Sequence, residues 1–162
     1  MQPAKGNNHH RLKKAISNEL AEIEKLVDEL AELGLYPEIK AETVGGFSKN
    51  SSNACHLVGS LVSEYYNNLE QIARHIAKEI NPDSPSRPQE EIDWFEQLAD
   101  SQPGNNSALF KEEILGGIKN LKEFHRTFQA GYCSSLNPKQ VYDNITLVTK
   151  IHPHIKNKLS QL

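Results

Sequence analysis

Apolar residues recur every three or four positions along most of this chain, and the longest such run lies between residues 54 and 80. Its main stripe consists of Ala54, Val58, Leu61, Tyr65, Leu69, Ile72, Ile76 and Ile80. A second stripe beside it consists of Cys55, Val62, Tyr66, Ala73 and Ala77. This spacing predicts an α-helix, and so wide an apolar arc is typical of a helix that is central in a bundle or shared with a second subunit.

Four other segments carry apolar residues at helical spacing. The first covers residues 11–33, and Gly34 and Pro37 supply its stop. A short amphipathic helix is predicted around residues 94–99, and a long helix from Ser107 to about Tyr132. The last segment follows Asn137-Pro138, which is a good N-cap and first-turn signature.

Prolines, glycines and capping residues predict where these helices begin, bend and end. Asn53 is a candidate cap for the central helix, and Pro153 predicts a kink or a break in the last one. The pair Gly116-Gly117 indicates a bend or a close approach to another helix. Segment 35–52 contains a Gly45-Gly46 pair and reads as a long connection. We recognise no alternating strand and no two-residue hairpin turn.

Length and composition fit one globular domain. The chain has 162 residues, of which 37% are hydrophobic and 24% are charged. We therefore expect a single all-α, up-and-down bundle of about five helices over residues 11–162, preceded by a flexible tail over residues 1–10. The net charge of -3 argues against a protein that coats duplex nucleic acid.

The remaining composition points to a cytoplasmic protein without a cofactor. Cys55 and Cys133 are far apart and fit no metal spacing, which suggests a reducing compartment. There is no run of 18 apolar residues and no secretory signal, so no membrane contact is expected. His152 and His154 lack the i, i+4 spacing of a metal-binding helix face, and we expect neither a metal nor a cofactor.

The segment from Phe124 to Tyr132 gathers an imidazole, a guanidinium and a phenol. Metal-free cleavage of RNA needs a base for the 2′-hydroxyl proton, an acid for the leaving oxygen and a cation for the developing charge. His125 could act as base or acid, Arg126 could brace the phosphate, and Tyr132 could orient or protonate. Arg74 and His75 on the central helix offer a further cation and imidazole if the two helices are neighbours.

Each of these residues also has a purely structural interpretation. A histidine at a periodic apolar position is more often a hydrogen-bonded packing residue than a catalyst. Tyr132 is equally explicable as an amphipathic anchor at a helix end. Arg126 could simply pair with Glu123 on the same helix.

The order of motifs resembles the HepT-like ribonuclease toxins of type VII toxin–antitoxin systems. The resemblance covers roughly residues 11–160 and rests on an acidic first helix and three segments, "SEYYNNLEQIARHIAKEI", "DWFEQL" after a Pro-rich linker, and "LKEFHRTFQAGYCSSLNPKQV". It implies a HepT-like helical fold, a homodimer, metal-independent endoribonuclease activity on RNA, and a partner that is a minimal nucleotidyltransferase antitoxin of the MntA type.

The chain departs from the family in the nuclease motif, which is Arg, four residues, His, one residue, Tyr. Aligning Tyr132 with the family's Tyr puts Ala130 at the catalytic His and His125 at the Arg, with Arg126 one position later. Only the Tyr is retained. In the family this Tyr can accept adenylate groups from the partner transferase, so the resemblance makes Tyr132 the candidate for modification.

Two functional hypotheses follow, with a third that the chain is a helical interaction module unrelated to toxins. In the first, His125 and Arg126 have taken over the role of the lost His in a divergent ribonuclease toxin. In the second, the protein is catalytically silent, dimerises, and binds a nucleotidyltransferase or RNA. Because proton transfer contributes roughly 10²–10⁴-fold in rate, we expect the nuclease to be impaired. Convergence of His75, His125, Arg126 and Tyr132 in one cleft would favour catalysis.

Overall fold

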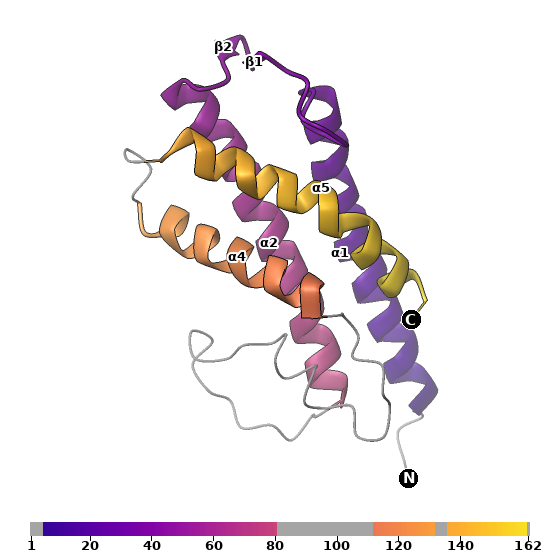
Figure 1. Cartoon of the computed structure of the whole chain (residues 1–162). Helices are drawn as coiled ribbons and strands as arrows, with labels where there is room; N and C mark the ends of the chain where they lie inside the picture. The colour runs from indigo at the N-terminus through magenta and orange to yellow at the C-terminus, as the bar shows by residue number, and fades with distance from the viewer. Residues whose placement is uncertain (1–4, 81–111, 132–135, 162) are drawn as a thin grey trace.

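The computed structural model describes residues 5–80, 112–131 and 136–161 (Figure 1). Within these ranges it contains four helices and one short hairpin, in the order α1 (Lys5–Glu32), β1 (Thr43–Val44), β2 (Phe47–Ser48), α2 (Ser52–Ile80), α4 (Glu112–Gln129) and α5 (Pro138–Ser160). The predicted all-α fold is confirmed, and the described residues contain four of the about five predicted helices. The helix predicted around residues 94–99 lies outside these residues.

Helix α2 is the centre of the bundle. It packs against α1 on one side and against α4 and α5 on the other, and α1 and α2 run in opposite directions (Figure 1). Both apolar stripes predicted for this helix are buried where they are described; Tyr65 and Val62, for example, are completely inaccessible. The wide apolar arc is therefore covered within a single chain, so it no longer provides a reason to expect a second subunit.

Helix α1 begins earlier than the sequence predicted but ends where it was expected to end. It starts at Lys5, so residues 5–10, which we assigned to a tail, are helical. At the other end Gly34 has a φ of 77°, and the N–H of Leu35 donates to the carbonyl oxygen of Leu30 at 2.9 Å. A glycine in the left-handed region followed by such a bond is a common helix stop, as predicted.

Helix α2 takes its N-cap from a different residue than predicted. The hydroxyl of Ser51 accepts a hydrogen bond from the N–H of Ala54 at 3.2 Å, while Asn53 lies inside the first turn. The cap prediction was therefore displaced by two residues, because serine and asparagine are comparably good caps and both occur here.

The connection between α1 and α2 contains the hairpin that the sequence analysis did not recognise. Strands β1 and β2 pair antiparallel across a two-residue turn, in which Gly45 and Gly46 have φ values of 58° and 83°. A Gly-Gly turn flanked by two-residue strands gives no alternation to detect, and only the glycine pair signalled it. The hydroxyl of Tyr142 donates to the carbonyl oxygen of Lys49, which ties the end of this connection to α5.

Helices α4 and α5 pack closely because of one glycine. A Cβ on Gly117 would lie 3.0 Å from the side chain of Leu147 and 3.1 Å from that of Ile151, whereas one on Gly116 would meet nothing within 4 Å. Gly117 therefore confirms the predicted close approach. The adjacent Gly116 faces open space.

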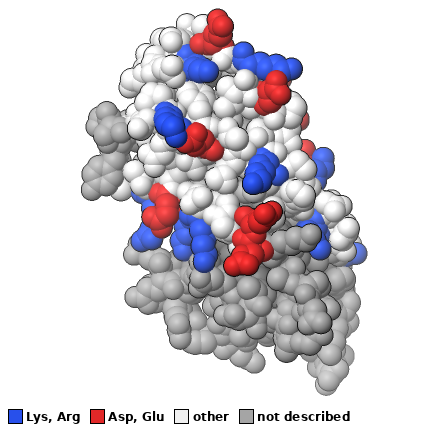
Figure 2. Space-filling view, in the orientation of Figure 1, with Lys and Arg blue, Asp and Glu red and all other residues white. Residues whose placement is uncertain are grey.

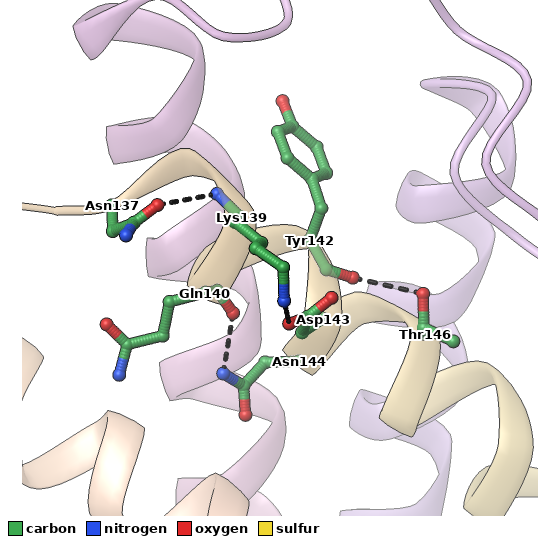
Figure 3. A network of polar contacts seen from close by, with 7 residues as sticks. All are labelled: Asn137, Lys139, Gln140, Tyr142, Asp143, Asn144 and Thr146. Carbon is green, nitrogen blue, oxygen red and sulfur yellow. Dashed lines mark hydrogen bonds and ion pairs between the residues drawn. The ribbon is translucent and has the colours of Figure 1, made fainter.

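Helix α5 begins as predicted and is not interrupted. The side chain of Asn137 caps it by accepting from the N–H of Lys139 at 2.9 Å, and further polar contacts continue along its first turns (Figure 3). The break considered at Pro153 does not occur, since the helix runs through it to Ser160. Pro153 is exposed, so water can bind the backbone oxygen that loses its donor. None of the described helices is both long enough and apolar enough to span a membrane.

Candidate functional site

The candidate site lies where the last turns of α4 cross α2, and small residues on α2 make the crossing close. A Cβ on Gly59 would lie 3.2 Å from the ring of Phe128 and 3.3 Å from that of Phe124. About two turns further along α2, His125 lies over Tyr66, with ring centroids 5.0 Å apart and planes tilted by 43°. The imidazole of His125 is therefore half-buried between the two helices.

A buried serine holds one nitrogen of this imidazole. The hydroxyl oxygen of Ser63 lies 2.7 Å from Nδ1 of His125, and the Ser63 side chain is almost inaccessible, with 3% exposed. The amide of Gln129 donates to the same hydroxyl oxygen at 3.5 Å. With its oxygen accepting from Gln129, the Ser63 hydroxyl can donate its proton to Nδ1, and a neutral His125 then carries its own proton on Nε2.

Burial sets the protonation of His125. Removal from water lowers its pKa below the usual value, while the negative charge of Glu70 and the backbone of Ser63 act in the opposite direction. Glu70 is itself paired with Arg74 at 3.5 Å. The imidazole is consequently neutral near pH 7, a state that can accept a proton but is a poor acid.

Arg126 does not share this environment. Its guanidinium is 65% exposed and lies 3.6 Å from Glu123, which is 72% exposed. Successive residues of an α-helix point about 100° apart, so Arg126 faces solvent when His125 faces α2. The pairing with Glu123 is the structural alternative that the sequence suggested.

The two supporting residues predicted on α2, Arg74 and His75, do not contact His125 either. Arg74 contacts Glu70 and Gln71, both at 3.5 Å. His75 lines a different cavity, together with Arg11 of α1. Tyr132 lies outside the described residues, and Ala130 is exposed just after the end of α4.

The neighbourhood of His125 includes three residues that sequence reasoning missed, namely Ser63, Glu70 and Gln129. A signal for the first two was present, because Gly59, Ser63, Tyr66 and Glu70 follow one another at helical spacing beside the apolar stripes of α2. A line of small and polar residues next to a core stripe indicates a helix contact that includes polar groups.

A second imidazole forms a more complete network in the core. Nδ1 of His152 lies 3.1 Å from the hydroxyl of Tyr65, and Nε2 lies 2.9 Å from Glu24, which also approaches Lys156 at 3.5 Å. Burial lowers the pKa of His152, although Glu24 opposes the shift, and burial raises the pKa of Tyr65. His152 is 2% exposed, so this network joins α1, α2 and α5 without access for a substrate.

The described residues hold no cluster of metal ligands, and the face shown in Figure 2 has no broad track of one charge. Within residues 5–80, 112–131 and 136–161, no group of three or more His, Cys, Asp or Glu side chains is arranged to hold a metal ion. On the face shown in Figure 2, lysine and arginine side chains alternate with acidic ones. Mixed charge on this face offers no continuous track for a phosphate backbone.

Comparison with known proteins gives one match. The family model described as HepT-like protein matches residues 57–162, more than half of the chain, and this region contains most of α2 and all of α4 and α5. The resemblance drawn from the sequence motifs is thereby confirmed at the level of the family. No curated protein and no solved structure matches the chain.

Proposed function

This chain belongs to the HepT-like family, and we propose that it is a toxin-related protein with an impaired nuclease site that acts by binding. The observation that carries the proposal is the separation of the cationic groups near the family motif. Arg126 is exposed and paired with Glu123, and His75 lines another cavity. Among the described residues, His125 contacts Ser63 and Tyr66 but no second imidazole, and the other histidine at this crossing, His56 of α2, lies against Phe128 instead.

One imidazole does not supply the chemistry of metal-free RNA cleavage. The reaction needs proton acceptance, proton donation and charge stabilisation, and each proton-transfer group contributes roughly 10²–10⁴-fold in rate. Ala130 offers no proton-transfer group at the position aligned with the family's His. The lowered pKa of His125 also favours only one of the two roles, that of a base.

The alternative is an active, divergent ribonuclease. It is supported by the neutral His125, whose Nε2 is free to accept a proton in the tautomer where Nδ1–H donates to the Ser63 hydroxyl oxygen, and by Arg74, which is paired with Glu70. In this alternative His125 would act as the base and Tyr132 as the acid.

Rebuilding the family motif tests the proposal. The double variant His125→Arg, Ala130→His restores Arg, four residues, His, one residue and Tyr132. RNA incubated with a chelator should stay intact with the wild type and be cleaved by the double variant. Circular dichroism before the assay checks that the variant is folded. Wild-type cleavage as fast as that of the rebuilt variant would contradict an impaired site.

The binding role that we propose has two protein partners, a second copy of the chain and a nucleotidyltransferase of the MntA type. Family membership supports both, whereas the apolar arc of α2 is already covered by α1, α4 and α5. A monomer in light scattering at micromolar concentration would exclude the homodimer. Incubation with the transferase and labelled ATP should label the wild type and not Tyr132→Phe; an unlabelled wild type would exclude the modification.

A further inference from the structure

A cavity of about 290 Å³ lies between the N-terminal half of α1 and the last turns of α2. It is lined by Arg11, Leu12 and Ala15 of α1 and by His75, Lys78 and Glu79 of α2. The side chains of Arg11 and Lys78 are exposed, and that of His75 is half-buried. Three nitrogen-bearing side chains therefore surround a small space with an apolar floor.

The cations of this cavity differ from several others on the surface, which are held in ion pairs. Lys25 is paired with Glu22, and Arg126 with Glu123. Arg11 and Lys78, by contrast, make no ion pair with any acid in the part of the chain that the structure describes. Residues 5–18 contain no acidic residue either, so the first half of α1 carries positive charge throughout.

The charges favour an anion even after opposing contributions are counted. Arg11 and Lys78 provide two positive charges, and Glu79 removes one. The C-terminal end of α2 adds the equivalent of roughly half a negative charge. These charges add up to a positive value without any contribution from His75. The ring of His75 offers an N–H donor in any protonation state.

We propose that this cavity binds the terminal phosphate of a phosphate monoester, as found in a nucleotide or at the 5′ end of an RNA. A phosphate monoester carries about 1.5 to 2 negative charges near pH 7, so a site of net positive charge attracts it more strongly than it attracts a diester with a single charge. The planar guanidinium of Arg11 can bind two oxygens at once, and Lys78 supplies a point charge. Leu12 and Ala15 leave room on the apolar side for the group that carries the phosphate.

This cavity lies apart from His125 and shares none of its contact residues. Ser63 and His75 are 12 residues apart on α2, which corresponds to about 18 Å along the helix. Phosphate binding and nuclease activity can therefore be lost separately, and failure of one proposal leaves the other standing.

Titration of the labelled full-length protein, followed by NMR of the backbone and of the His75 ring, tests the site. The probes are inorganic phosphate, adenosine 5′-monophosphate, and one short oligoribonucleotide with either a 5′-phosphate or a 5′-hydroxyl. Saturable shifts should appear at His75 and Lys78 with the phosphorylated probes. Tighter binding of the 5′-phosphorylated oligonucleotide than of the free anion identifies an RNA end; equal binding identifies a small phosphate compound.

Charge variants then distinguish a built site from diffuse attraction. Arg11→Gln and Lys78→Gln should each weaken binding about threefold to fivefold, as expected for exposed charge pairs. Glu79→Gln should strengthen it by a similar factor, because the only acid among the described residues that line the cavity is removed. Lys25→Gln, which removes the same charge from α1 outside the cavity, serves as the matched control.

Three results would overturn the proposal. One is the absence of saturable shifts at His75 with every phosphorylated probe. Another is an equal loss of affinity in Arg11→Gln and Lys25→Gln, which would show that only the net charge of α1 attracts the anion. Equal binding of the 5′-hydroxyl oligonucleotide would likewise exclude a site for terminal phosphates.

Discussion

His125 of α4 and His152 of α5 both lie against α2 but differ in how many of their ring nitrogens are hydrogen-bonded. In each case Nδ1 contacts a hydroxyl group of α2, that of Ser63 for His125 and that of Tyr65 for His152. The second nitrogen of His152 contacts Glu24, whereas Nε2 of His125 has no hydrogen-bond partner in the described part of the chain. His152 is fully buried and His125 only half-buried.

The difference shows how a histidine that stabilises the fold is distinguished from one that can still contact a ligand. A buried imidazole with both nitrogens occupied contributes to stability, because removing it leaves polar partners without bonds. An imidazole with one nitrogen at a helix groove can still meet a ligand. Periodicity alone places both residues on apolar faces, and only the three-dimensional contacts separate them.

Removal of the buried imidazole should have the largest effect on stability. His152→Ala leaves a cavity and deprives the hydroxyl of Tyr65 of its partner, so the free energy of unfolding should fall by about 2–4 kcal/mol. Urea denaturation measures the change. His154→Ala, at an exposed position of the same helix, is the control and should change stability by less than about 0.5 kcal/mol. Equal losses of stability in His152→Ala and His154→Ala would contradict a stabilising role for the buried contacts of His152.

The packing that holds α4 in place should show the next largest effect. Gly117→Ala forces a Cβ to within 3.0 Å of Leu147 and should lower the free energy of unfolding by about 1–3 kcal/mol. Gly116→Ala meets nothing and should raise it by about 0.5–1 kcal/mol, because alanine favours the helix. Thermal or urea unfolding of the pair compares them directly, and destabilisation by Gly116→Ala would contradict the assigned faces of α4.

The hydroxyl beside His125 should contribute less than the one beside His152. Ser63→Ala removes one hydrogen bond at a half-buried ring that water can reach, so the expected loss is about 0.5–1 kcal/mol. Tyr65→Phe leaves Nδ1 of a fully buried ring without a donor and should cost more, about 1–2 kcal/mol. A larger loss for Ser63→Ala would show that the His125 contact is the stronger structural link.

Both histidines should also make stability depend on pH in the same direction. Their pKa values are lowered in the folded protein from the usual 6.5, so the unfolded chain binds protons first as the pH falls. Stability is therefore fully present above about pH 6.5 and declines below it. Urea unfolding at several pH values should show a shallower decline in His125→Gln and in His152→Gln. An unchanged slope in both variants would contradict the lowered pKa values.

The sequence predicted the parts of the fold that depend on local repetition. The stripes of α2, the stop at Gly34 and the cap at Asn137 were all readable, because each involves residues within a few positions of one another. The hairpin at Gly45-Gly46 escaped detection because strands of two residues show no alternation. The cap of α2 was misplaced for a similar reason, since neighbouring polar residues could all serve.

The candidate site was predictable only in its centre. The sequence identified His125 from its motif, but the partner Ser63 lies 62 positions away in the chain, and spacing carries no information about such a pair. The separation of Arg126 from His125 follows from helix geometry, and we had stated its pairing with Glu123 only as an alternative. His152 was weighed as a metal ligand because the sequence does not show Tyr65 and Glu24 on either side of it.

The most direct test of an impaired nuclease site compares the wild type with His125→Ala on RNA in the presence of a chelator. Both proteins should be assayed at the same purity and concentration, and circular dichroism should show that they are equally folded. The account predicts that RNA stays equally intact with both, because one imidazole without a second proton-transfer group does not support cleavage. Cleavage by the wild type that is lost in His125→Ala would contradict it and establish His125 as a catalytic residue.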